Sequence, residues 1–169
     1  MRILVTGGAG FIGSNFVHRR LAATDDSIIV VDKLTYAGNP ANLADLADDP
    51  AVRERYRFVQ ADIADAPLMQ ELASECDAIV NFAAESHVDR SILEPTAFLH
   101  TGVMGVYSLL EAARIEAEKR DGDFRLLQVS TDEVYGPVPE GLSVESDPIR
   151  PTSPYSAAKA AGEHLVAAY

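Results

Sequence analysis

The sequence predicts an α/β protein with a doubly wound parallel sheet and helices on both of its faces. Short apolar runs rich in β-branched residues alternate along the chain with stretches of helical spacing. A glycine-rich turn at 7–13 follows the first apolar run and leads directly into the first helical stretch. The second apolar run ends in an acidic residue, Asp32, about twenty residues after that turn. Together these observations are typical of a Rossmann-type sheet that binds a dinucleotide.

Continuous β-branched runs are typical of strands that are covered on both faces. The expected strands are 2–6, 28–32, 56–59, 78–82 and 124–130. Pro40, Pro67 and Pro95 stand near the starts of helical stretches, where the fixed φ of proline suits the first turn. The expected helices are 11–23, 40–48, 66–75, 95–120 and 153–169. Residues 136–151 are rich in proline, glycine and acidic residues, and they are expected to form an exposed loop.

The last expected helix has a broad apolar face through Ala157, Ala161, Leu165 and Ala168, with no later segment to cover it. A sheet of two mononucleotide-binding halves also needs a sixth strand. We therefore expect residues 1–169 to be an incomplete NAD-binding domain. The remaining strand and a substrate-binding region are expected after residue 169.

Composition excludes several classes of function. The chain has 169 residues, with 14 basic against 26 acidic side chains and a net charge of −12, and it has no dense basic patch for nucleic acid. The single cysteine, Cys76, excludes an internal disulfide and is expected to be a small buried residue. The four histidines lack ligand spacing, so no metal site is expected. No signal peptide or membrane-spanning run is visible, which predicts a cytoplasmic protein.

The glycine turn and Asp32 predict a particular cofactor. Gly7, Gly10 and Gly13 have separable roles, namely the tight turn, the close approach of backbone N–H groups to a pyrophosphate, and close packing of helix on strand. Asp32 can accept hydrogen bonds from ribose hydroxyls and would repel a 2′-phosphate. NAD is therefore favoured over NADP, although Lys33 weakens that preference slightly.

A second group of residues indicates chemistry at the fifth strand. Thr131, Asp132 and Glu133 follow the apolar run 124–129 and are expected at the carboxyl end of a strand, where open α/β sheets bind ligands. Tyr155 and Lys159 are four residues apart and would share one helix face. We interpret them as a redox tyrosine and a separate acid/base pair in one cleft. The simpler alternatives are a solvated strand end with capping acids and a chance Tyr-x-x-x-Lys spacing.

These motifs resemble the extended short-chain dehydrogenase/reductases and, more narrowly, the dTDP-glucose 4,6-dehydratases. The glycine motif and Tyr-x-x-x-Lys are shared across the superfamily, whereas the Thr-Asp-Glu triplet and the Ala-Ala-Glu-Ser-His-Val-Asp-Arg segment are more specific. The resemblance covers essentially the whole chain. It rests on residues 7–13, 32–39, 83–91, 130–136 and 155–159.

The resemblance implies oxidation of a sugar C4 hydroxyl by bound NAD, loss of water across C5 and C6, and return of the hydride to C6. Tyr155 would be the base at O4, with Thr131 bonded to the same hydroxyl. Lys159 would favour the Tyr155 phenolate and hold the nicotinamide ribose. Glu133 would remove the C5 proton. Asp132 would protonate the departing C6 hydroxyl, which requires burial or the nearby charge of Glu133 to keep it protonated.

The resemblance also implies contacts and partners. Ser86 and Thr131 would reach the substrate, and helices near 95–120 and 153–169 would form a homodimer. Around Thr101, His100 and the segment 102–104 depart from the family's Asn-Ile/Val-x-Gly pattern. The implied cofactor contacts are Gly7, Gly10, Phe11, Ile12, Gly13, Asp32, Lys33, Leu34, Thr35, Asp62, Ile63, Phe82, Ala83, Ala84, Glu85, Ser86, Thr101, Tyr155 and Lys159.

Related functions on the same fold remain open. A 4-epimerase has no use for the pair Asp132 and Glu133, and a uronate decarboxylase would keep the glutamate without the preceding aspartate. A non-catalytic dinucleotide-binding module should have lost the tyrosine, the lysine or the acids, all of which are present. A UDP-sugar 4,6-dehydratase would share the triplet, so these residues leave the nucleotide base undetermined.

Overall fold

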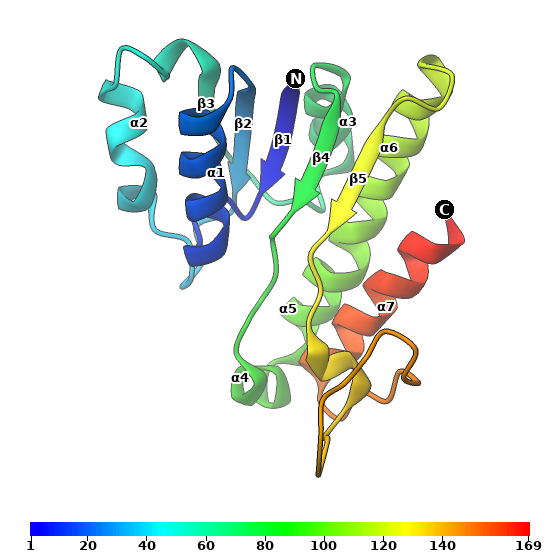
Figure 1. The fold of residues 1–169 in the computed structure, drawn as a ribbon. Helices are drawn as coiled ribbons and strands as arrows, with labels where there is room; N and C mark the ends of the chain where they lie inside the picture. Colours follow the sequence, from blue (N-terminus) through cyan, green and yellow to red (C-terminus); the bar gives the residue numbers. More distant parts are fainter.

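A computed structural model describes all 169 residues and contains one parallel sheet of five strands in the order β3-β2-β1-β4-β5. The crossover from β3 back to β4 beside β1 makes the sheet doubly wound, as the sequence predicts (Figure 1). Each predicted strand is present, within two residues of its expected bounds. The strands are β1 (Arg2–Thr6), β2 (Ser27–Asp32), β3 (Tyr56–Gln60), β4 (Ala78–Asn81) and β5 (Arg125–Gln128).

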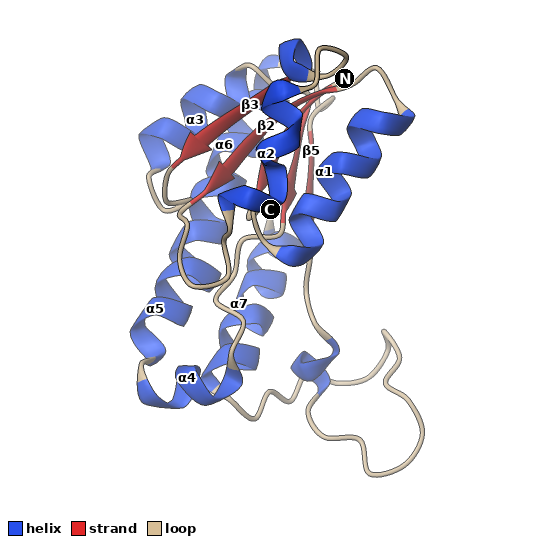
Figure 2. Ribbon diagram, turned by 90° about the vertical axis from the view of Figure 1, so that its left-hand side faces the viewer, coloured by secondary structure: helices blue, strands red, loops and turns tan.

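Helices cover both faces of this sheet (Figures 1 and 2). Short 3-10 turns span Pro40–Leu43, Arg53–Arg55 and Asp132–Tyr135, and His100–Gly105 forms a π-helix. The α-helices are α1 (Phe11–Ala23), α2 (Ala44–Asp48), α3 (Ala66–Ser74), α4 (Val88–Leu93), α5 (Pro95–Leu99), α6 (Val106–Lys119) and α7 (Pro154–Ala168).

Alternate residues of the central strands point into two separate hydrophobic cores, one on each face of the sheet. Leu4 and Ile29 point to one face, where they pack with side chains of α3 and α6. Ile3 and Val30 point to the other face and pack with α1 and α2. Because both faces are buried, the strands are continuously apolar, which is the pattern that the sequence shows.

The expected helix 95–120 is present as an unbroken helical stretch over 95–119, but its middle is π-helical, so that it consists of α5, the π-helix and α6. The preceding helix α4 was not predicted. The π-helix is closely packed: a Cβ at Gly102 would lie 3.2 Å from the Ala158 carbonyl oxygen of α7, and one at Gly105 would lie 2.5 Å from Ile63 Cδ1. It therefore lies against both α7 and the loop after β3, in the part of the chain that departs from the family pattern.

The fifth strand is two residues shorter at its carboxyl end than the expected 124–130. Val129 N–H still donates to the Asn81 carbonyl at 3.1 Å, but the chain then turns away from the sheet. The triplet at 131–133 therefore belongs to the 3-10 turn and its cap rather than to a strand end. Residues 136–153 contain no helix or strand, as expected for the loop, and they extend away from the sheet (Figure 2).

The remaining expectations from composition concern Cys76, membrane-spanning helices and metal-binding groups. Cys76 is fully buried, and burial raises the pKa of its thiol to about 12. No helix has both the length and the apolar character needed to cross a membrane. No three acidic, histidine or cysteine side chains are grouped closely enough to hold a metal ion.

Candidate active site

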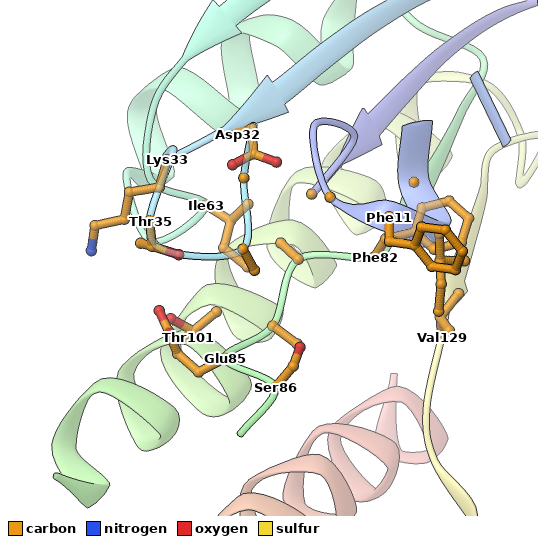
Figure 3. Close-up of a pocket in the computed structure, with 18 of the residues that line it drawn as sticks. Phe11, Asp32, Lys33, Thr35, Ile63, Phe82, Glu85, Ser86, Thr101 and Val129 are labelled. Atoms are coloured by element: carbon orange, nitrogen blue, oxygen red, sulfur yellow. The ribbon is translucent and has the colours of Figure 1, made fainter. Parts of the chain in front are cut away.

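A pocket with a volume of about 520 Å³ lies at the carboxyl ends of the strands. Its walls are the turn after β1, the loops after β2, β3, β4 and β5, the π-helix and the first turns of α7 (Figure 3). Leu34 is the one expected cofactor residue outside the wall, because its side chain packs against the core. The expected residues that line the pocket are Gly7, Gly10, Phe11, Ile12, Gly13, Asp32, Lys33, Thr35, Asp62, Ile63, Phe82, Ala83, Ala84, Glu85, Ser86, Thr101, Tyr155 and Lys159.

The three glycines of the turn differ in their surroundings. Gly7 has φ +69°, and a Cβ there would lie 2.5 Å from the Ala83 nitrogen. A Cβ at Gly13 would collide with the Gly7 carbonyl, so this residue permits close packing of α1 on the turn. At Gly10 a Cβ would meet only the Gly7 oxygen at 3.3 Å and the Ala37 oxygen at 3.9 Å, which leaves the rest of its surroundings open to the pocket.

Asp32 is almost completely buried at the end of β2, and backbone N–H groups hold its carboxylate. Oδ2 accepts from the N–H of Ala9 at 2.9 Å, and Oδ1 accepts from that of Leu34 at 2.8 Å. Leu34 has φ +58°, an unusual conformation for a bulky residue, and its N–H makes this contact in that conformation. Each oxygen keeps a second lone pair, so the carboxylate stays oriented and can still accept from a ribose hydroxyl.

Asp62 forms an ionic cluster on the side of the pocket expected to receive the adenine. Lys33 Nζ lies 2.6 Å from Asp62 Oδ2, and His100 Nδ1 lies 4.0 Å from the same oxygen. Burial raises the pKa of Asp62, but hydrogen bonds from Ala64 N–H and Lys33 and the charges of Lys33 and His100 outweigh it, so the pKa is lowered. Lys33 is therefore paired with a carboxylate rather than free to attract a 2′-phosphate.

A buried polar chain supports the floor of the pocket. Thr6 Oγ1 donates to Asn81 Oδ1 at 2.5 Å, and Asn81 Nδ2 donates to Gln128 Oε1 at 2.7 Å. Asn81 Oδ1 also accepts from the N–H of Ala83 at 3.0 Å. These bonds fix the ends of β1, β4 and β5 relative to one another. In the sequence, the feature that could have indicated them is a polar residue at the end of each apolar run.

Tyr155 stands at the start of α7, where Ser153 caps the helix and forms a capping box with Ser156. Its ring meets Phe98 edge-on, with centroids 6.4 Å apart. Burial is the main cause that raises the pKa of Tyr155. Thr131 lowers it through a hydrogen bond, whereas the charges of Glu133 and Asp132 raise it further. The phenol therefore lies within electrostatic reach of both acids.

Lys159 is buried and donates from Nζ to the Val129 carbonyl at 2.8 Å. Burial lowers the pKa of Lys159, and the charge of Glu163 opposes that effect. The pKa of Tyr155 is raised in this structure, and the ammonium of Lys159 faces the Val129 carbonyl. The expected effect of Lys159 on the Tyr155 phenolate stays a prediction.

Asp132 and Glu133 are both exposed and do not line the pocket. Thr131 caps their 3-10 turn, with Oγ1 accepting from the N–H of Glu133 at 3.3 Å. The burial expected for Asp132 is absent because the strand ends early and the turn leaves the sheet.

Several pocket residues were not anticipated from the sequence. Tyr36 and His87 contribute aromatic rings from two different loops, and Ser130 donates from Oγ to Glu163 in a short hydrogen bond. A tyrosine or histidine in a loop carries no periodicity, so only the three-dimensional contacts identify them. The unanticipated lining residues are Val31, Tyr36, Ala37, Gly38, Ala61, His87, Val129 and Ser130.

Comparison with known proteins assigns the chain to a family. A family profile described as GDP-mannose 4,6 dehydratase matches residues 4–169. Low-salt glycan biosynthesis protein Agl12 of Haloferax volcanii is 51% identical over the whole chain, which covers 52% of that protein. dTDP-glucose 4,6-dehydratase 1 of Escherichia coli is 48% identical, again over the whole chain and 50% of the relative. The chain thus spans about half the length of these relatives.

Solved structures give the same result. DesIV, a dTDP-glucose 4,6-dehydratase from Streptomyces venezuelae with NAD bound, superposes with a TM-score of 0.88 at 50% identity, covering all of this chain and 51% of that one. A UDP-glucose 4-epimerase from Thermus thermophilus with NAD reaches 0.82 at 35% identity, covering 100% and 50% of the two chains. The resemblance to dTDP-glucose 4,6-dehydratases is confirmed. The chain belongs to the GDP-mannose 4,6 dehydratase family.

Proposed function

We propose that the protein is an NAD-dependent dTDP-glucose 4,6-dehydratase that forms dTDP-4-keto-6-deoxyglucose. The observation that carries this proposal is the meeting of two groups of residues at one pocket. The glycine turn and Asp32 form one wall, Tyr155 and Lys159 form another, and the acids of the 131–133 triplet lie within electrostatic reach of Tyr155. The pocket volume of about 520 Å³ suits a ligand-binding cleft.

The pocket residues fit NAD. The open surroundings of Gly10 and the N-terminus of α1 suit a pyrophosphate, and the oriented Asp32 carboxylate suits the adenosine ribose. Lys159, anchored on Val129, is placed to donate to the second ribose. When bound, NAD would take a hydride from sugar C4 and later return it to C6.

The acid and base roles proposed for these side chains are those that the family resemblance implies. Tyr155 would take the proton from the C4 hydroxyl, with Thr131 beside it to bond that oxygen. Once C4 is a ketone the neighbouring C5 proton is acidified, and Glu133 would remove it. Asp132 would donate a proton to the departing C6 hydroxyl, so that water leaves without a high-energy hydroxide.

The acid pair and the comparisons favour dehydration over epimerisation. An epimerase oxidises and reduces C4 alone and needs no second acid/base pair. The identity is 48% to the dTDP-glucose 4,6-dehydratase of Escherichia coli and 51% to that of Streptomyces niveus, against 35% to the Thermus thermophilus epimerase. The remaining strand and the sugar-binding region are proposed to come from sequence after residue 169, because the chain covers about half of its relatives.

We also propose a cytoplasmic homodimer. Exposed apolar side chains follow one another along α5, the π-helix and α6, which are the helices expected at the interface. A patch of this kind on a protein surface indicates an interaction site. Its members are Leu99, Met104 and Tyr107.

The decisive experiment incubates the full-length protein with dTDP-glucose and, separately, with UDP-glucose, and measures the alkali-induced absorbance of a 4-keto-6-deoxy sugar. Asp132→Asn and Glu133→Gln variants run in parallel. We expect keto-sugar from dTDP-glucose and a loss of about a hundredfold or more in both variants, the size typical of a lost general acid or base. Keto-sugar from UDP-glucose alone would change the assigned nucleotide. A 4-epimer or no product would overturn the dehydratase.

A further inference from the structure

Tyr36 makes three contacts that join two loops on opposite sides of the glycine turn. Its hydroxyl oxygen accepts a hydrogen bond from the N–H of Ser86 at 2.8 Å. Its ring stacks on His87, with centroids 5.0 Å apart and planes inclined by 29°. The guanidinium carbon of Arg90 lies 4.1 Å from the centre of the Tyr36 ring, within the range of a cation–π interaction.

The order of the strands in the sheet shows which segments these contacts connect. Tyr36 follows β2, whereas Ser86, His87 and Arg90 follow β4, and β1 lies between β2 and β4 in the sheet. A connection between the loops after β2 and β4 must therefore pass the turn that follows β1. Figure 3 shows Thr35, next to Tyr36, and Ser86 at the same pocket.

The base of the Tyr36 loop is fixed, so that its tip is held in place. The Ala9 carbonyl in the glycine turn accepts from the N–H of Asn39 at 3.0 Å and from Asn42 Nδ2 at 2.9 Å. By contrast, Phe82–Ser86 has no regular secondary structure, and Arg90 has no acidic partner. Tyr36 is thus a specific attachment between the β2 loop and the loop after β4.

We propose that Tyr36 is a positioning residue that retains the dinucleotide by tying these two loops together across the glycine turn. This inference rests on the proposed function in one respect, namely that the pocket binds NAD. It also has a chemical reason. A dehydratase of this kind removes a hydride and returns it in the same cycle, so reduced cofactor that escapes between the two steps leaves the enzyme unable to finish. Slow cofactor release is therefore a requirement of the reaction.

The test measures release of NADH from the full-length protein after mixing with excess NAD, without any sugar, by the loss of protein-bound NADH fluorescence. We expect Tyr36→Ala to release NADH at least about tenfold faster, because a hydrogen bond and two aromatic contacts are lost. Tyr36→Phe keeps the ring and loses the acceptor, so release should be about threefold faster. Arg90→Met should accelerate release in wild type and have little further effect in Tyr36→Ala.

Tyr169→Phe is the matched control, because it also removes the hydroxyl of an exposed tyrosine that makes one hydrogen bond, there to Glu111, and lies outside the pocket. Its release rate should equal that of wild type. A purely structural role of Tyr36 would lower the melting temperature without changing release. Equal release rates in wild type and Tyr36→Ala, or no NADH binding by wild type, would overturn the inference. If the wild-type protein makes no keto-sugar but Tyr36→Ala still releases NADH faster, the inference on Tyr36 is supported and the dehydratase proposal fails.

Discussion

Lys159 on α7 donates to the carbonyl of Val129 at the end of β5, across 2.8 Å. This bond fixes the helix that carries Tyr155 to the sheet that forms the pocket floor. One turn further along α7, Glu163 accepts a hydrogen bond from Ser130, the neighbour of Val129. Two consecutive residues of the β5 loop are therefore held by two side chains of one helix face, which fixes Tyr155 in the wall of the pocket.

Glu163 is predicted to keep Lys159 charged. Its carboxylate opposes the burial that lowers the pKa of Lys159, so Glu163→Gln should lower that pKa further. A lysine with a lower pKa loses its proton at lower pH, and the alkaline decline in turnover should move to lower pH. The measurement is the pH profile of keto-sugar formation by the full-length protein. Glu118→Gln, an exposed change on α6, is the control and should keep the wild-type profile.

The negative charges of Asp132 and Glu133 are predicted to add to the effect of burial on the pKa of Tyr155. Asp132→Asn and Glu133→Gln should each lower the pKa of Tyr155, because both charges raise it in the wild-type protein. The pKa is measured from the ultraviolet absorbance of tyrosinate, with Tyr155→Phe as the reference that removes this signal. An unchanged titration in both variants would show that the acids lie too far from the phenol to act on it.

Stability is predicted to fall in alkali because of Cys76. Its folded-state pKa is about 12, well above the ordinary thiol value, so above about pH 9 the folded state binds the more protons. The free energy of unfolding should therefore decrease as pH rises, by up to about 1.4 kcal/mol per pH unit from this group. Cys76→Ala should lose less stability than wild type between pH 9 and pH 10, as measured by urea unfolding. Parallel slopes would contradict the prediction.

The proposed dimer makes a prediction about two exposed leucines, one on the apolar patch and one outside it. Leu99→Glu places a charge on the patch along α5, the π-helix and α6, and should raise the dimer dissociation constant by at least about tenfold. Leu142→Glu makes the same change in the exposed loop and should leave the dimer intact. Light scattering coupled to size-exclusion chromatography measures the mass. A monomeric wild-type protein, or equal effects of both changes, would exclude this interface.

Features defined by local sequence could be predicted from the sequence. Apolar runs predicted the strand that ends before Gly7 and the strand that ends at Asp32. The glycine turn predicted the start of α1, and both ends of this helix lie at the expected residues. Most of the cofactor pocket was predictable for the same reason, since its walls are the segments that directly follow the strands. Family resemblance added the residues after β3 and β4.

Features defined by contacts between distant segments could not be predicted. The close approach of Gly102 to Ala158 joins the π-helix to α7, and the contact between Tyr36 and Ser86 joins residues 50 positions apart. The exposure of Asp132 depends on where β5 stops pairing with β4, which sequence periodicity locates only within a few residues. In each case the deciding interaction is tertiary.

The π-helix at His100–Gly105 also affects how this region tolerates change. A π-helical turn holds about one residue more than an α-helical turn, so removing a single residue there would restore a continuous α-helix. Such a deletion would remove the extra residue of the π-helical segment and leave α5 and α6 in nearly the same register. A deletion inside α6 would instead rotate the preceding part of the helix by about 100°, since an α-helix turns once in about 3.6 residues. Phe98 would keep its contact with Tyr155 only in the first case. In evolution, one codon lost in this stretch can therefore be absorbed without moving the catalytic residues.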